Sequence, residues 1–398
     1  MTDTIIDLDR FDISEDRGFL PKQDPLRDLP KEFASLQSAV EELPDRLASH
    51  AWGPAFEAIE IPQVDLSTLT KDQLEAVFRD FSFATAAWIW EFWQDNNPRT
   101  SIPKNVAVPF VACANVLRRP PILAYPSYGP RNWYRYDLQG PIGFNNTGLI
   151  RKFYGGLDES GFILPHVEIE AYAGAAVVAA IRAQEAVMKG DIQQCERELT
   201  KLAQSLQKVV ITLKRIPDCC EKDIYNKRVR AFIFGIFGHD LFKDNGGLIY
   251  EGVAEFGGKP QKPRGETGAQ SVIFHLLDWA LGVIHDEASK LSKHLRQMRS
   301  YMPVEHRELL GIVEDRMKVR GFVADHKELI DVFDACLLLM IEFRQQHYKF
   351  ARDYIFNQSN TQGALANPSH LGTGGTDFNE SLAQHVQDTQ RTLIRVEH

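Results

Sequence analysis

Hydrophobic positions recur at helical spacing along most of the chain, whereas strand-like alternation is weak everywhere. The spacing predicts helices over about residues 31–48, 71–93 (with 67 as an alternative start), 162–188, 190–214, 222–239, 269–285, 287–300, 304–317 and 325–356, and a last polar helix from about 379. The chain is therefore predicted to be mostly α-helical.

Proline and glycine mark the segments between these helices. Residues 1–30 are polar and proline-punctuated, which predicts an extended arm, and the proline-rich residues 97–147 predict an irregular linker that crosses the protein. Residues 243–268 form a long loop, of the kind that often serves as a lid or binding loop. We place a boundary near 140–155, between a small N-terminal domain (1–145) and a large helical domain (146–398).

Two of the predicted helices have unusual composition. The apolar positions of 71–93 spread around the whole helix, which predicts a buried helix, and we interpret Trp88, Trp90 and Trp93 as core rather than as a cofactor pocket. The segment 162–188 begins irregularly around Pro165 and becomes rich in alanine and glycine. Such small side chains either let a flat or bulky group approach the helix backbone or serve tight packing between helices.

Charge and cysteine content exclude several classes of protein. The formal charge is −9 and no run is rich in Lys or Arg, which argues against nucleic acid and anionic membranes as partners. We find no signal peptide and no apolar run of about 18 residues, so we expect no membrane span. The five cysteines lack C-x-x-C spacing, which argues against disulfides or a zinc site and favours a reducing cytoplasm.

One histidine stands on an apolar helical face. Phe343, His347, Phe350 and Tyr354 share this face of the helix predicted over 325–356. Such a histidine is either a hydrogen-bonded core residue or a metal ligand. The chain has neither C-x-x-C-H nor H-E-x-x-H nor another close histidine pair. A metal at His347 would therefore take its other ligands from outside the protein side chains, as haem iron on a single proximal histidine does.

Three further polar features accompany His347. His166 lies at the irregular start of the alanine-rich segment, and Arg230 leads into an apolar segment, where a cation must be paired or bind an anion. The sequence GTGGTD at 372–377 offers backbone N–H groups and hydroxyls to a carboxylate or phosphate, or is simply a mobile loop. It lacks the strand, helix and lysine of a phosphate loop. Together these features suggest a buried cofactor and a small ligand that carries a carboxylate.

Several motifs then carry a family resemblance. They are IPKNVAVPF (102–110), RPPILAY (119–125), GLIYEG (247–252), MRSYMPVEHRELL (298–310), FDAC (333–336), FRQQH (343–347) and GTGGTD. In this order they resemble the indoleamine 2,3-dioxygenase family, the haem enzymes that open the indole ring of tryptophan. The resemblance implies a large all-α domain whose distal side is covered by the smaller N-terminal domain, with haem b between them.

The resemblance also implies roles for single residues. His347 matches the proximal iron ligand, and Arg344, Asp278 and Thr267 match positions that support the haem. Arg230 matches an arginine that pairs with the substrate carboxylate. The remaining matches are the loop residues Thr373 and Gly374, which close over the substrate, and Tyr125, Phe162 and Tyr225, which surround the indole ring.

Three positions depart from the family pattern. His166 stands where serine is common, and by analogy with the distal histidine of tryptophan 2,3-dioxygenase we expect it to contact either the substrate N–H or bound dioxygen. We expect Phe234 to make the pocket smaller and Asn226 to make it more polar.

The function implied is a haem-dependent dioxygenase of tryptophan catabolism by the kynurenine pathway. It inserts both atoms of O2 across the C2–C3 bond of tryptophan or a related indoleamine and forms an N-formylkynurenine-type product. Alternatives are another oxidation or rearrangement of a tryptophan derivative in secondary metabolism, or a non-catalytic O2-binding haem protein. Arg230 and GTGGTD argue against the last, because oxygen storage needs no carboxylate site. We expect a cytoplasmic monomer that needs an electron donor to keep its iron ferrous.

Overall fold

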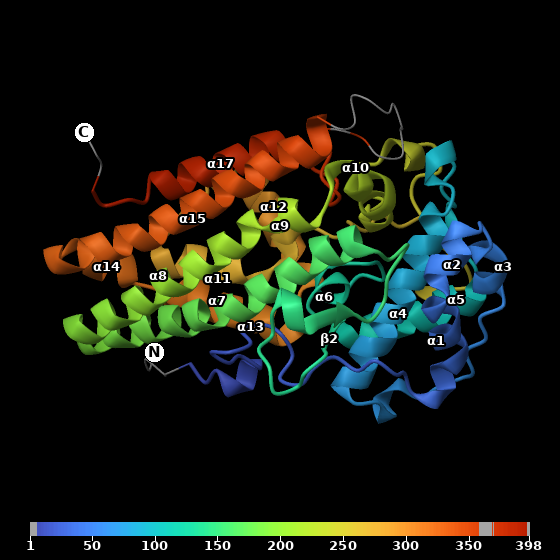
Figure 1. The fold of residues 1–398 in the computed structure, drawn as a ribbon, viewed down its shortest axis with the longest axis horizontal. Coiled ribbons are helices and arrows are strands. Elements are labelled where there is room, and N and C mark those ends of the chain that lie inside the picture. The colour runs from blue at the N-terminus through green and yellow to red at the C-terminus, as the bar shows by residue number, and fades with distance from the viewer. Residues whose placement is uncertain (1–5, 358–367, 369, 396–398) are drawn as a thin grey trace.

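The computed structural model describes residues 6–357, 368 and 370–395, and it confirms a mostly helical chain. Four helices lie side by side along the long axis of the molecule (Figure 1): α7 (Leu157–Lys189), α8 (Ile192–Lys214), α15 (Ile330–Ala351) and α17 (Phe378–Gln390). Shorter helices complete this half: α9 (Ile216–Cys219), α10 (Lys222–Ile224), α11 (Val272–Leu281), α12 (Lys290–Met298), α13 (Val304–Arg316) and α14 (Val319–Ala324).

The N-terminal helices gather at the other end of the molecule, coloured blue to teal in Figure 1. They are α1 (Ala34–Glu41), α2 (Leu43–Ala48), α3 (Trp52–Glu57), α4 (Lys71–Trp90), α5 (Lys104–Leu117) and α6 (Tyr125–Tyr128). Two small sheets lie among the helices. In one, β1 (Ser101–Ile102) pairs in parallel with β4 (Ile249–Tyr250), and in the other β2 (Trp133–Arg135) pairs antiparallel with β3 (Thr147–Leu149).

Helix α4 is the buried helix that the sequence predicts. It begins with a capping box, in which Thr70 and Gln73 each satisfy the other's backbone N–H. Almost its whole circumference is buried, and Trp88 stacks on Phe56 with 4.6 Å between ring centroids. The indole of Trp90 donates to the carbonyl of Phe234. The interpretation of these tryptophans as core is confirmed.

Three sequence expectations about helices are wrong. Residues 104–117 form α5 rather than a linker, because its buried apolar face outweighs the one hydrogen bond that Pro109 removes. Pro165 lies inside α7, which already begins at Leu157, so His166 sits within a regular helix. The predicted helix 222–239 ends early, in a π turn (225–229) and a 3₁₀ turn (230–233). The backbone at Gly235 there packs so closely on Gly265 that a Cβ would lie 2.0 Å from its nitrogen.

The glycines of α7 let the backbone of neighbouring segments pack directly against the helix. A Cβ at Gly174 would lie 2.5 Å from the nitrogen of Gly18 and 2.7 Å from the carbonyl oxygen of Glu15, so the N-terminal arm lies directly on the helix. At Gly161 the neighbour is the carbonyl of Cys219, 1.9 Å from such a Cβ. Helix α7 also has the length and composition to cross a membrane, but 78% of its most apolar window is buried inside the protein, as expected of a core helix.

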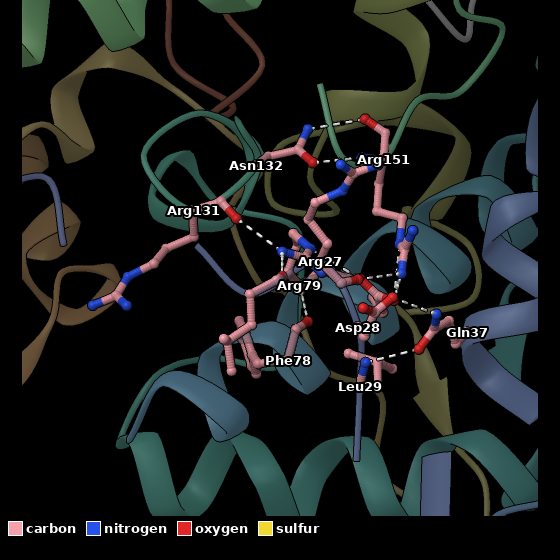
Figure 2. A network of polar contacts seen from close by, with 12 residues as sticks. Arg27, Asp28, Leu29, Gln37, Phe78, Arg79, Arg131, Asn132 and Arg151 are labelled. Atoms are coloured by element: carbon pink, nitrogen blue, oxygen red, sulfur yellow. Dashed lines mark hydrogen bonds and ion pairs between the residues drawn. The ribbon is translucent and has the colours of Figure 1, made fainter. Parts of the chain in front are cut away.

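A buried polar network ties the arm to α4 and to the segment before α7 (Figure 2). Arg79 donates to Asp80 and to the carbonyls of Leu26 and Arg131. Asp80 also accepts from Arg151, which lies beyond the predicted domain boundary, and both side chains are almost fully buried. The two-domain division stays a prediction, but this ion pair joins residues from both sides of it.

Candidate functional site

A large, mostly apolar cavity lies between α7, α11, α15 and α17 and the loops that precede α11 and α17. Its volume, measured as the space open to the centre of a water molecule, is about 240 Å³. One water needs only about 10–15 Å³ by this measure, so the cavity has room for a large ligand. The cavity brings together every predicted site residue except Arg230, namely Tyr125, Phe162, His166, Tyr225, Thr267, Asp278, Arg344, His347, Thr373 and Gly374.

His347 projects from α15 into this cavity. Its side chain is exposed, yet the surface it exposes lies inside the protein, and burial together with the nearby His166 lowers its pKa to about 4. No described residue hydrogen-bonds its ring. The imidazole is therefore neutral at pH 7, and a neutral imidazole with an open nitrogen is the form that binds a metal.

His166 projects from α7 into the same cavity. Its Nδ1 lies 2.7 Å from the carbonyl oxygen of Phe162, one turn earlier. Because a carbonyl only accepts, Nδ1 carries the proton and donates it, which leaves Nε2 with a free lone pair. Burial lowers the pKa of His166, so the ring stays neutral and Nε2 is an acceptor at neutral pH.

Aromatic rings form a wall beside His166. The Phe162 ring lies 5.0 Å from the imidazole and 4.6 Å from the Tyr225 ring, measured between centroids. The Tyr125 hydroxyl donates to Glu170 at 2.8 Å, and Ser271 donates to the same carboxylate at 2.9 Å. These bonds fix the phenol ring of Tyr125, so this wall is rigid and shaped for a flat aromatic ligand.

Arg344 and Asp278 form a buried ion pair one turn from His347. The guanidinium lies 2.5 Å from Asp278 Oδ1, and His285 lies 3.2 Å from Oδ2. Burial raises the pKa of Asp278, but the charge of Arg344 and the contacts with His285 outweigh it and hold this pKa well below its usual value. No hydrogen bond links Asp278 to His347 among the described residues, so its support of that histidine runs through Arg344.

The same end of the cavity carries a group of side chains that could hold a cation. Oxygen and nitrogen atoms of Asp278, His285 and His385 lie within 4.8 Å of one another. His285 also lies 2.8 Å from Asp388, and although burial lowers its pKa, its hydrogen bonds to both aspartates raise it overall. The hydrogen bonds of His285 to two carboxylates, and the ion pair of Asp278 with Arg344, engage the carboxylate of this cluster without a metal ion.

The loop that contains GTGGTD closes the cavity. Thr373 donates its hydroxyl to the carbonyl of Glu266, and its own carbonyl accepts from Gly235 at 3.0 Å. Arg264 donates to the carbonyl of Gly374 at 2.7 Å. Gly375 has φ +77°, and a Cβ there would lie 2.0 Å from the carbonyl oxygen of Phe237. The glycine therefore serves a close approach of two chains.

Arg230 lies behind this loop rather than in the cavity wall. It is fully buried, and it donates to the carbonyls of Pro368 and Leu371 at 3.0 and 2.5 Å. Burial lowers its pKa to about 10, which leaves it cationic at neutral pH. The expected effects of Phe234 and Asn226 on the pocket are wrong, because neither lines it: Phe234 packs under the Arg230 guanidinium at 4.6 Å, and Asn226 donates to the carbonyl of Tyr354.

A family model described as indoleamine 2,3-dioxygenase matches residues 7–392. The chain belongs to the indoleamine 2,3-dioxygenase family. Indoleamine 2,3-dioxygenase 1 of Rattus norvegicus is 30% identical to it over 400 residues, which cover 97% of this chain and 96% of the relative. Indoleamine 2,3-dioxygenase 2 of Homo sapiens is 27% identical over 409 residues (99% and 96%). The 6-hydroxytryptophan 2,3-dioxygenase of Fusarium equiseti is 27% identical over 394 residues (96% and 93%).

Membership of the indoleamine 2,3-dioxygenase family confirms the resemblance seen in the motifs. Family members are haem-dependent dioxygenases, and the protein is accordingly an oxidoreductase of this type. In this member of the indoleamine 2,3-dioxygenase family, α15 contributes His347 to the cavity lining, α11 contributes Asp278, and α7 contributes His166.

The sequence reasoning missed five polar residues of this region. His275, His294 and His385 line the cavity, His285 supports it, and Glu266 lines it beside the closing loop. Buried nitrogens of His294 and His385 have no hydrogen-bond partner among the described residues. Each histidine stands alone in its own segment, and an acid in a glycine-rich loop usually faces solvent. No local pattern in the sequence marks them.

Proposed function

We propose that the protein is a haem b-dependent dioxygenase that adds both atoms of O2 across the C2–C3 bond of an indole, with tryptophan as the first candidate substrate. One observation carries the proposal. Two neutral imidazoles, His347 and His166, project into one cavity with aromatic walls, and each has a ring nitrogen that no described residue engages.

The residues at the His347 end fit a haem. A neutral, unpartnered imidazole suits the iron, and the ion-paired Arg344 with Asp278 secures the helix face from which it projects. Thr267 and the side chains of His294 and His385, which line the cavity, would meet the polar edge of the macrocycle. When bound, haem iron supplies the dioxygen chemistry.

The residues at the other end orient the substrate. Phe162, Tyr225 and Tyr125 would flank the indole ring, and Nε2 of His166 would accept the indole N–H. The loop at 371–377 covers the cavity and excludes water, which holds the reacting groups in place. Arg230 would engage the substrate carboxylate by exchanging its bonds to the loop carbonyls for bonds to the ligand.

Turnover of L-tryptophan tests the proposal. The haem-loaded protein is reduced, mixed with L-tryptophan under air, and the product is followed by its absorbance and its mass. Formation of N-formylkynurenine, heavier than tryptophan by two oxygen atoms, supports the proposal. Binding of L-tryptophan without any oxygenated product would overturn it. Comparing electron donors in the same assay shows which class of reductant supports turnover.

A tryptophan derivative is the second candidate substrate. The relative from Fusarium equiseti is named for 6-hydroxytryptophan and covers 96% of this chain. A clear preference for 6-hydroxytryptophan over L-tryptophan in competition would favour a role in secondary metabolism. Equal or lower turnover of the hydroxylated compound would favour tryptophan catabolism.

A further inference from the structure

We propose that Glu266 is a subsite for a positively charged group, the ammonium of an indole amine or amino acid, at the aromatic end of the cavity. The inference deepens the proposed function, on which it rests, because it names the part of the substrate that this end of the cavity recognises.

Glu266 is held in place by its own backbone. Its N–H donates to the carbonyl of Ile233 at 3.1 Å, and its carbonyl accepts the hydroxyl of Thr373. The next residue, Thr267, would lie 3.2 Å from a Cβ at Gly374. The side chain is 6% exposed and lines the cavity. These contacts hold Glu266 at the point where two loops meet, with its side chain in the wall of the cavity.

The carboxyl group of Glu266 has no partner in the part of the chain that the structure describes. No described residue forms a hydrogen bond or an ion pair with it. Asp278, the other acid among the described residues that line the cavity, is paired with Arg344 on the His347 side. Arg230 does not line the cavity, and it is engaged by the carbonyls of Pro368 and Leu371. A buried carboxylate is stable only with a cation or a hydrogen-bond donor, so a cationic ligand would supply what the protein leaves out.

The position of this carboxyl group suits an ammonium attached to an indole. Glu266 lines the same cavity as Tyr125 and Tyr225, and after burial it is among the causes that raise the pKa of both phenols, so it lies near the wall proposed for the indole ring. The faces of these rings also attract a cation. An indole on this wall would place its short amine side chain within reach of Glu266.

Ion pairing at this subsite should release a proton, and the number of protons released on binding can be measured. Burial raises the pKa of Glu266 to about 8, so the empty site holds a neutral acid at pH 7. An ammonium that pairs with it favours the ionised form, and the acid must then release its proton. Binding of an indole amine at pH 7 should release close to one proton, whereas an uncharged indole should release none at this site.

The test uses calorimetry on the haem-loaded protein with tryptamine and with indole-3-propionate, which share the ring but carry opposite charges. Titration in two buffers of different ionisation enthalpy gives the number of protons released. Glu266→Gln keeps the size of the side chain but cannot ionise. Glu159→Gln is the matched control, because Glu159 is also a buried acid whose pKa burial raises to about 7, but it accepts from Phe153 and Gly155 away from the cavity.

The proposal expects the tryptamine affinity to fall at least about tenfold in Glu266→Gln, with loss of the proton release, while indole-3-propionate binds as well or better. Glu159→Gln should change neither. Unchanged tryptamine affinity, equal losses for both ligands, or no proton release from the unsubstituted protein would each overturn the subsite; the last needs no variant to fold. Glu266-dependent binding of tryptamine without turnover of L-tryptophan would instead overturn the proposed function alone.

Discussion

Arg344 and Asp278 lie 2.5 Å apart, and their side chains are only 5% and 7% exposed. The pair joins α15, one turn before His347, to α11, so it fixes the position of the helix that carries the candidate iron ligand. A buried charge that loses its partner is costly, because the remaining ion has no water to solvate it.

Asp278→Asn should therefore lower the free energy of unfolding by about 3 kcal/mol at pH 7. Because the folded-state pKa of Asp278 lies below its unfolded value near 3.8, its stabilisation is present above that pH and is lost as the pH falls. The difference between the two proteins should shrink below about pH 4. Urea unfolding at several pH values measures it. Asp240→Asn, in an exposed pair with Lys243, should cost no more than about 0.5 kcal/mol; an equal cost would contradict the role of burial.

His347→Ala should abolish stable haem binding while the apo-protein keeps its fold. The imidazole faces the cavity rather than packed side chains, so its removal should change the free energy of unfolding by less than about 1 kcal/mol. The Soret absorbance after gel filtration reports haem retention, and added imidazole should restore part of it. Gln345→Ala, two residues away and exposed, is the control. Full haem retention in His347→Ala would show that His347 is not the iron ligand.

His166→Ala should remove discrimination against 1-methyl-tryptophan, because only an acceptor for the indole N–H senses that methyl group. The free lone pair on Nε2 follows from the hydrogen bond between Nδ1 and the carbonyl of Phe162. Dissociation constants for L-tryptophan and its 1-methyl derivative measure the ratio. Phe162→Leu, which alters the same wall without touching an acceptor, should weaken both ligands alike. A ratio unchanged by His166→Ala would contradict the assigned contact.

Gly375→Ala should loosen the closing loop and raise the KM for substrate at least about fivefold. It combines an unfavourable φ of +77° with a clash against the carbonyl of Phe237. Gly257 separates the two effects, since it has φ +55° with nothing within 4 Å of a Cβ. Gly257→Ala should cost only about 1 kcal/mol of stability and leave KM unchanged. Similar KM values for both variants would show that the loop contact is unimportant.

Three buried acids should make the protein less stable as the pH rises. Burial raises the pKa of Glu159 and Glu170 to about 7 and that of Glu266 to about 8, from an ordinary value of 4.5. The folded state then keeps protons that the unfolded state has released, and each such proton costs about 1.4 kcal/mol per pH unit. Histidines with lowered pKa act in the opposite sense, but only below about pH 6.5: His275, His294, His306 and His347.

In the window from pH 6.5 to 8 the histidines with lowered pKa no longer contribute, while His285, whose pKa is raised by its hydrogen bonds to Asp278 and Asp388, changes the stability in the same direction as the acids. Urea unfolding across this window should show stability falling with pH, and Glu266→Gln should flatten the upper part of this slope. A flat profile for the unsubstituted protein would contradict the raised pKa values.

The helical half of the fold was predictable because long apolar stripes dominate it. The stripe through Phe343, His347 and Phe350 correctly placed His347 on a helix, and most of the site residues implied by the family resemblance line one cavity. The predicted helix boundaries were wrong at Pro109 and Pro165. The loss of one backbone hydrogen bond destabilises the helix less than the burial of its apolar face stabilises it. The position of Glu266 in the cavity wall was unpredictable, since it depends on backbone hydrogen bonds with Ile233 and Thr373, both distant in sequence.

The contact between the N-terminal arm and α7 links the start of the chain to the helix that carries His166. Gly174, which receives the arm at Gly18, lies about two turns after His166 on the same helix. Packed helices move as stiff rods, so a shift at one contact is passed along the axis. Under the proposed function, residues 6–20 therefore help to position His166. The arm also buries Phe11, Ile13 and Leu20 in the core, so its truncation should lower the stability of the fold as well as shift this helix.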